Sequence, residues 1–176
     1  SGKTASVIAI FKLWQKKSNR QMKYLVISKA KYSGAFVKAN QTFRFNLQMI
    51  LEKDDLPMIF NSAESSVDVY FISYTQLAVI LKQEAGVNNP YLKEFNHLCN
   101  KLDAVVIDEV QMFRNYKTVA TQSVKKVTDL LHQRQNRRPD SSFPRIIAMT
   151  GTPVHKDLTD LYQIFQLVQR GLLGTY

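Results

Sequence analysis

The middle of the chain carries the sequence Asp103-Ala104-Val105-Val106-Ile107-Asp108-Glu109, in which an unbroken apolar run ends in two adjacent acids. A short apolar run without polar alternation is typical of a strand that is buried on both faces, as in a parallel sheet. Two carboxylates at the end of such a strand are costly unless a cation or hydrogen-bond partners accompany them. The stretch therefore predicts a parallel sheet with a chemically active edge, and an acid-rich helix N-terminus is the alternative.

Further apolar runs extend this pattern in both directions along the chain. Strands are predicted at 24–28, 69–73 and 145–149, and the stretch 53–67 is ambiguous, with room for a short strand at 58–60. Helices are predicted at 4–17, 33–52, 74–84, 91–101, 117–132 and 157–168. Strands that alternate with helices predict an α/β fold with a mostly parallel sheet and helices on both faces. Such sheets bind their ligands beyond the carboxyl ends of the strands.

The chain opens with Ser1-Gly2-Lys3-Thr4, which matches the last residues of the phosphate-binding loop G-x-x-x-x-G-K-[ST]. Gly2 would let the backbone approach the phosphates, Lys3 would reach the β- and γ-phosphates, and the Thr4 hydroxyl would ligate Mg²⁺. Ser1 completes the predicted cofactor-binding segment, and the following helix offers its positive N-terminus to the anion. ATP with Mg²⁺ is the predicted cofactor pair, and an ordinary loop before a helix is the alternative.

Two further motifs follow predicted strands. Asp108 would hold Mg²⁺, mostly through water, and Glu109 would act as the catalytic base that orients and polarises the attacking water. The segment Thr150-Gly151-Thr152-Pro153 follows the last strand, and its hydroxyls could bond the region of the two acids and relay the state of the nucleotide. A plain turn is the alternative for this segment.

Charge is distributed unevenly along the 176 residues, whose net charge is +10. Residues 1–51 contain ten Lys or Arg and no acid, residues 52–109 have a net charge of −6, and residues 110–176 have a net charge of +6. If the fold brings the two basic regions onto one face, a polyanion is the predicted partner. A polar stretch at 133–142, predicted to be an exposed loop, carries three arginines (134, 137 and 138) and is a candidate contact. A solvated basic surface is the alternative.

Composition limits the class of protein. The length suits one domain with a sizeable core. A single cysteine, Cys99, allows no internal disulfide and favours an intracellular, reducing location, which would be the nucleus if the source or host is eukaryotic. No apolar run approaches the about 20 residues of a membrane span, so no membrane partner is expected. Because Ser1 already lies inside a motif and no initiator Met precedes it, we expect a domain taken from a longer protein.

With these motifs in order, the chain resembles the superfamily 2 helicase-like ATPases, and most closely their Snf2 branch. The resemblance covers nearly all of residues 1–176 as a first RecA-like, helicase ATP-binding lobe of the P-loop NTPase type, and the second lobe is absent from this chain. It rests on three segments: Asp108-Glu109-Val110-Gln111-Met112-Phe113-Arg114-Asn115, Thr150-Gly151-Thr152-Pro153-Val154 with the helix after it, and Ile72-Ser73-Tyr74-Thr75, which is similar to the family's "TSYE" motif.

The resemblance implies ATP-driven translocation on double-stranded DNA, typically without strand separation, and by family analogy work on chromatin or protein–DNA complexes. It implies nucleic-acid contacts at Ser28 and Lys29, in the place of motif Ia, and at Ser73 and Tyr74. Gln111 replaces the usual His of D-E-A-H, can still bond the third motif, and joins Lys3 and Glu109 in the predicted catalytic set. Because the second lobe supplies an arginine finger, we expect the isolated lobe to hydrolyse ATP weakly or not at all.

Three other functions stay open at this point. Another superfamily 2 enzyme, such as an RNA helicase or a restriction-type translocase, would respond to a different nucleic acid. A degenerate ATPase fold could serve as a nucleic-acid or protein scaffold, although the intact Lys3, Asp108 and Glu109 argue against it. A basic nucleic-acid-binding module with chance motifs would bind in a salt-sensitive way and ignore ATP.

Overall fold

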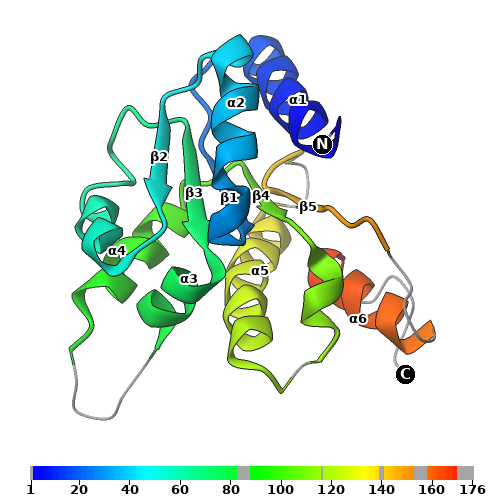
Figure 1. Cartoon of the computed structure of the whole chain (residues 1–176). Helices are drawn as coiled ribbons and strands as arrows, with labels where there is room; N and C mark the ends of the chain where they lie inside the picture. Colours follow the sequence, from blue (N-terminus) through cyan, green and yellow to red (C-terminus); the bar gives the residue numbers. More distant parts are fainter. Residues whose placement is uncertain (1, 83–87, 116, 139–140, 153–157, 170–176) are drawn as a thin grey trace.

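A five-stranded parallel sheet in the order β2-β3-β1-β4-β5 runs through the molecule in the computed structural model (Figure 1). The structure describes residues 2–82, 88–115, 117–138, 141–152 and 158–169. The strands are β1 Tyr24–Ser28, β2 Leu47–Ile50, β3 Val69–Ser73, β4 Ala104–Ile107 and β5 Arg145–Ala148. The predicted α/β class with a parallel sheet is confirmed.

Helices cover both faces of the sheet. One face carries α1 (Gly2–Ser18) and α2 (Ser33–Phe43), which lie side by side in Figure 1. The other face carries α3 (Tyr74–Leu81), α4 (Pro90–Cys99), α5 (Val119–Arg137) and α6 (Leu158–Val168). Alternate side chains of β1 enter the two cores, with Val26 facing the α1 side and Ile27 the other. Double burial of this kind explains why the strand reads as an unbroken apolar run.

The register of the sheet aligns the strand ends that matter for function. Ser28 at the end of β1 pairs with Ser73 at the end of β3, and Ile107 of β4 pairs with Ile27 on one side and Ala148 on the other. Segments that follow these strands therefore begin at one edge of the sheet, where parallel α/β folds bind ligands.

The region 33–52 differs from its prediction as one helical region. α2 ends at Phe43 because Arg44 adopts a left-handed backbone conformation (φ 56°), which an α-helix does not continue. The Asn40 side chain then redirects the chain through two 2.9 Å hydrogen bonds with the backbone of Phe45. Residues 47–50 form the edge strand β2 instead, which the predicted set of strands lacked.

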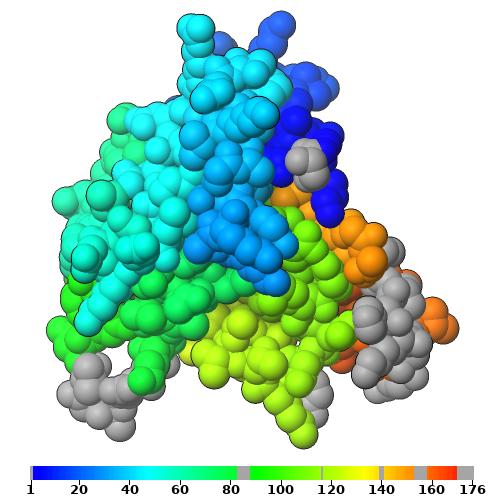
Figure 2. All heavy atoms as spheres, in the orientation of Figure 1, coloured from blue at the N-terminus to red at the C-terminus, as the bar shows by residue number. Residues whose placement is uncertain are grey.

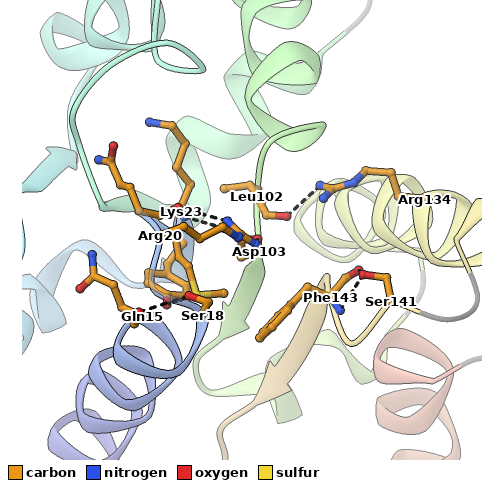
Figure 3. A network of polar contacts seen from close by, with 12 residues as sticks. Gln15, Ser18, Arg20, Lys23, Leu102, Asp103, Arg134, Ser141 and Phe143 are labelled. Atoms are coloured by element: carbon orange, nitrogen blue, oxygen red, sulfur yellow. Dashed lines mark hydrogen bonds and ion pairs between the residues drawn. The ribbon is translucent and has the colours of Figure 1, made fainter.

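Two further predictions are wrong. The short strand predicted at 58–60 falls mostly within a 3-10 helix, η2 (Lys53–Ile59), whose start is held by a reciprocal capping of Glu52 and Asp55. The loop predicted from residue 133 begins later, because α5 continues to Arg137. Arg134 lies in this last part of α5 and donates to the carbonyl oxygens of Cys99 (2.7 Å) and Leu102 (2.8 Å), as Figure 3 shows for Leu102. Its guanidinium therefore supports the end of α4 rather than an exposed loop.

Two shorter 3-10 helices, η1 (Ala30–Tyr32) and η3 (Val110–Arg114), follow β1 and β4. Among the helices within the described ranges, none combines the length and the apolar character needed to cross a bilayer.

Candidate nucleotide site

Asp108 begins the segment after β4, and its buried carboxylate is held by two donors. The Ser28 hydroxyl donates to Oδ2 at 2.7 Å, and the backbone N–H of Glu109 donates to Oδ1 at 3.0 Å. The N–H of Asp108 itself donates to the carbonyl oxygen of Ile27 at 2.9 Å, which continues the sheet one residue beyond β4. These bonds offset the cost of a buried negative charge and fix its position, while each oxygen keeps a lone pair for a cation or its water shell.

Glu109 adopts a left-handed backbone conformation, with φ 50° and ψ 45°, at the start of η3. For a residue with a Cβ, this conformation costs roughly 1 kcal/mol of conformational free energy or more. Residues with strain of this kind are found most often at functional sites. The turn brings its Oε1 to 3.9 Å from the Lys3 Nζ, and its Oε2 accepts a hydrogen bond from the Gln111 amide. Both members of this ion pair are partly exposed, so the pair contributes little to the stability of the fold. It shows instead that the Lys3 and Glu109 side chains, from two different motifs, lie close together.

Thr150 and Gln111 connect the segment after β5 with the two acids. The Thr150 hydroxyl donates to the Gln111 Oε1 at 2.6 Å, and the Gln111 amide donates in turn to Glu109. The N–H of Thr152 donates to the Thr150 Oγ1 at 3.0 Å, so that the hydroxyl also organises its own turn. The hydrogen bond expected between Gln111 and the third motif is therefore present, and the role of Thr150, Gly151 and Thr152 in coupling stays a prediction.

Lys3 lies in the first turn of α1, at the point where all three motifs meet. Its Nζ would be 3.5 Å from a Cβ built on Gly151, in addition to the 3.9 Å contact with Glu109. Thr4 follows with a buried side chain, and a Cβ added at Gly2 would meet nothing within 4 Å. Ser1 and Pro153, which the sequence also places in these motifs, lie outside the described residues.

Known proteins resemble this chain in sequence and in fold. No family model matches the chain. The chain is 26% identical over 175 residues to a protein of Bacillus subtilis (strain 168) named "Putative ATP-dependent helicase/translocase YwqA", a match that spans 99% of the chain and 16% of that relative. It superimposes with a TM-score of 0.63 and 21% identity on a solved structure described as "Sulfolobus solfataricus SWI2/SNF2 ATPase core in complex with dsDNA".

The chain has the fold of an Snf2-like ATPase lobe. The resemblance seen in the motifs is thereby confirmed. The solved structure is matched over 99% of this chain and 31% of its own length, so the Snf2-like lobe spans less than a third of either protein that it resembles.

The Snf2-like lobe buries three of the four side chains predicted to contact nucleic acid. The Ser28 hydroxyl is taken by Asp108, and Ser73 caps α3, accepting from the N–H of Gln76 at 3.3 Å. The buried Tyr74 donates its hydroxyl to the carbonyl oxygen of Asp108. Among the four, Lys29 is the residue whose side chain is partly exposed, directly after β1. Contact of this edge with nucleic acid stays a prediction, and its geometry favours backbone groups and Lys29.

Sequence reasoning missed that Ser28 and Tyr74 support Asp108 through their hydroxyl groups. The Tyr74 ring packs at 89° against Phe113, with centroids 4.9 Å apart, and burial raises the pKa of its hydroxyl, so Tyr74 remains a proton donor. Tyr74 stands at the start of α3 and Asp108 at the end of β4, and nothing in the spacing of 34 residues predicts their contact. The register of the sheet creates it.

The oxygen atoms at this site fit the divalent cation that the lobe is expected to use. Asp108 offers a carboxylate and Thr4 a hydroxyl, which are the hard oxygen ligands that Mg²⁺ prefers, usually one or two from the protein with water and phosphate completing the shell. Asp108 already accepts two hydrogen bonds, which suits binding through water.

Proposed function

We propose that this chain is the ATP-binding lobe of an ATP-dependent DNA translocase of the Snf2 type. It would hydrolyse ATP when a second RecA-like lobe of the same parent chain and nucleic acid are both present. The observation that supports this most directly is the meeting of Lys3, Glu109 and Gly151 at one edge of the sheet, with Asp108 held beside them. Double-stranded DNA is the proposed nucleic acid, since the Sulfolobus core was solved with it.

The proposed chemistry begins with an exchange of partners by Lys3. Its ammonium group would leave Glu109 for the β- and γ-phosphates of ATP, which are stronger partners for a point charge than a partly exposed carboxylate. Bound Mg²⁺ would neutralise developing phosphate charge, with Asp108 and Thr4 as its protein ligands. Once its ion pair with Lys3 is broken, Glu109 would orient the attacking water as general base. The Gln111 amide would hold the Glu109 carboxylate in place, and the Thr150 hydroxyl would hold Gln111.

Tyr74 is the proposed link between the nucleic-acid edge and the nucleotide site. It belongs to the "TSYE"-like segment, is the first residue of α3, and donates its hydroxyl to the backbone carbonyl oxygen of Asp108. A shift of this segment on binding DNA would therefore move Asp108 directly. We propose Tyr74 as a positioning residue for this reason.

The test is ATP hydrolysis by the full-length parent with duplex DNA, single-stranded DNA or RNA, comparing the wild type with Lys3→Ala. Lys16→Ala, an exposed lysine at the other end of α1, is the matched control and should hydrolyse ATP like the wild type. Stimulation by duplex DNA that Lys3→Ala abolishes supports the translocase. Stimulation by RNA alone would replace it with an RNA helicase, and hydrolysis that does not depend on Lys3 would overturn the enzyme assignment in favour of a scaffold.

A further inference from the structure

The face of the sheet that α1 and α2 cover is built from basic elements. Residues 1–51, which include both helices, contain ten Lys or Arg and no Asp or Glu. Figures 1 and 2 show the two helices, coloured blue to cyan, in the upper part of each view. A surface built from such elements has a positive potential that attracts a polyanion.

Two of these cations, Lys38 and Arg44, have exposed side chains that form no hydrogen bond or ion pair within the described residues. Lys38 lies on the outer side of α2, two residues after the buried Phe36, and Arg44 directly follows the helix. Asp68 accepts a 2.9 Å hydrogen bond from the N–H of Asn46, close to Arg44 in the chain, but it forms no ion pair with Arg44. Both charges are therefore available to a partner.

Arg44 has a backbone conformation that favours a different residue. Its φ of 56° and ψ of 44° are left-handed. Glycine and asparagine are the usual residues in this conformation after a helix, because a Cβ is strained there. A cation can also interact with the helix dipole from within the last turn, where it meets no such strain. The position of a long cation at Arg44 therefore points to a use of its side chain outside the fold.

Lys12 brings α1 into the same surface. Its Nζ lies 5.1 Å from the centroid of the Phe45 ring, and Phe45 is the residue after Arg44. A contact with a ring face uses no hydrogen-bond acceptor, so the ammonium group keeps its three donors for a partner. Lys16 and Lys17 differ, because they lie in the last turn of α1, where cations stabilise the helix dipole.

The basic surface, which consists of Lys12, Lys38 and Arg44, continues from the edge where nucleic-acid contact is predicted. Lys29 lies at that edge, directly after β1. The 11 residues of α2, which start at Ser33, carry the chain from this edge back to the start of β2. A helix of this length spans about 16 Å. A charged backbone held at Lys29 would therefore meet Lys38 and then Arg44 on its way along α2.

We propose that duplex DNA extends from the strand-end edge over α2, with its phosphates at Lys38, Arg44 and Lys12. This inference rests on the proposed DNA partner of the lobe. A duplex is charged along its whole length, which suits cations that are spread over two helices. An acidic peptide binds through apolar side chains in a groove as well as through charge, and neither of the larger cavities of the described chain is lined by these three cations. Contacts to phosphate position the duplex without reading its sequence.

The first test measures the binding of a labelled duplex of about 30 base pairs to the full-length parent, without ATP, over a series of salt concentrations. Lys38→Gln with Arg44→Gln removes two charges from the surface. Lys53→Gln with Lys93→Gln removes two exposed lysines from η2 and α4 on the opposite face and is the matched control. In the first pair, the slope of log affinity against log salt should become shallower by about 2, and affinity at about 0.1 M salt should fall at least about tenfold. The control pair should bind like the wild type.

Arg44→Gly separates DNA binding from folding. Glycine relaxes the left-handed conformation, so the variant should unfold at a higher urea concentration than the wild type. Because it also lacks the cation, its salt slope should become shallower by about 1 and its affinity for the duplex should fall several-fold. A stabilised variant that binds DNA like the wild type would overturn the role of Arg44.

Three outcomes would overturn the proposal. The first is an unchanged salt slope in the Lys38 and Arg44 pair, and the second is an equal loss of affinity in the control pair. The third is competition by polyglutamate that matches an oligonucleotide of equal charge and is lost in the same variants, which would assign the surface to an acidic protein. A parent that binds no duplex would contradict the proposed translocase as well, whereas hydrolysis stimulated by DNA with unchanged salt slopes would overturn this inference alone. Circular dichroism of each variant establishes that the fold is intact.

Discussion

At the scale of single residues, Glu109 is expected to lower the stability of the fold through its left-handed backbone conformation while its side chain serves the proposed hydrolysis. Glu109→Gly should relax this conformation and raise the free energy of unfolding by about 1 kcal/mol, while abolishing hydrolysis in the full-length parent. Glu109→Gln is the control, because it also removes the base but keeps the Cβ and the strain. Urea unfolding of both variants tests the point, and equal stability of the two would contradict it.

Tyr74 is the second residue with a separable role. Tyr74→Phe removes the bond to the Asp108 carbonyl and keeps the ring against Phe113, so we expect a stability loss of about 1 kcal/mol. We also expect stimulation by DNA to fall several-fold, on the order of one lost hydrogen bond, with DNA affinity unchanged. Hydrolysis measured against DNA concentration gives both values.

A matched control for Tyr74 exists on the opposite face of the sheet. The buried Tyr24 hydroxyl donates to the Phe11 carbonyl at 3.0 Å, and Tyr24 begins β1, whose other end carries Ser28 beside Asp108. Tyr24→Phe makes the same chemical change, so it should lose comparable stability and keep full stimulation by DNA. Equal loss of stimulation in both variants would reduce Tyr74 to a general structural role.

At the scale of elements, Asp103 joins the end of α1 to the starts of β1 and β4 (Figure 3). This buried carboxylate accepts from Arg20 at 2.5 and 3.1 Å and from the backbone N–H of Lys23 at 2.9 Å, and the bond to Asp103 raises the pKa of Arg20. Asp103→Ala should lower the free energy of unfolding by about 2 kcal/mol, because it removes the buried carboxylate that accepts the hydrogen bonds of Arg20 and of the Lys23 N–H.

The control for Asp103 is an acid on the surface. Glu64 is well exposed and lies 3.6 Å from His97 and 4.0 Å from Lys101, so Glu64→Ala should change stability by less than about 0.5 kcal/mol. Urea unfolding of both variants measures the difference. Similar losses would mean that the Asp103 network does not join these elements.

At the scale of the whole molecule, buried groups predict loss of stability at alkaline pH. Burial raises the pKa of the Cys99 thiol from 9.0 to about 12 and also raises the pKa values of Tyr24 and Tyr74 above their usual 10.0. The folded chain then holds protons that the unfolded chain releases, so the free energy of unfolding should stay level below pH 9.0 and fall as the pH rises towards 12. Burial lowers the pKa of Lys23, which opposes this trend in part.

Chemical unfolding at a series of pH values measures this curve. Alkylation gives an independent reading, because the fully buried Cys99 thiol should react with iodoacetamide at pH 8.5 far more slowly in the folded than in the unfolded chain. Rapid alkylation of the folded chain would show that α4 opens locally.

The sequence by itself determined four of the five strands and the order of the three motifs. Strands β1, β3 and β4 are short apolar runs because they are buried on both faces, so their residue types alone indicate the burial. Strand β5 is a partly exposed edge strand, and it was predicted because its residues 146–148 still form an apolar run. Lys3, Asp108 and Thr150 were found because each belongs to a motif that stands at a recognisable place relative to a helix or a strand. Edge strand β2 was not predicted from the sequence, because it is partly exposed and the spacing of its apolar residues also suits a helix.

Only the tertiary structure decided which of these residues meet. The bonds of Asp108 with Ser28 and Tyr74 join positions that lie 80 and 34 residues apart. The packing of α3 against α5 likewise joins two helices that no local pattern connects. Periodicity reports whether a side chain is buried, but its neighbours are set by strand order and register, which depend on the packing of the whole sheet.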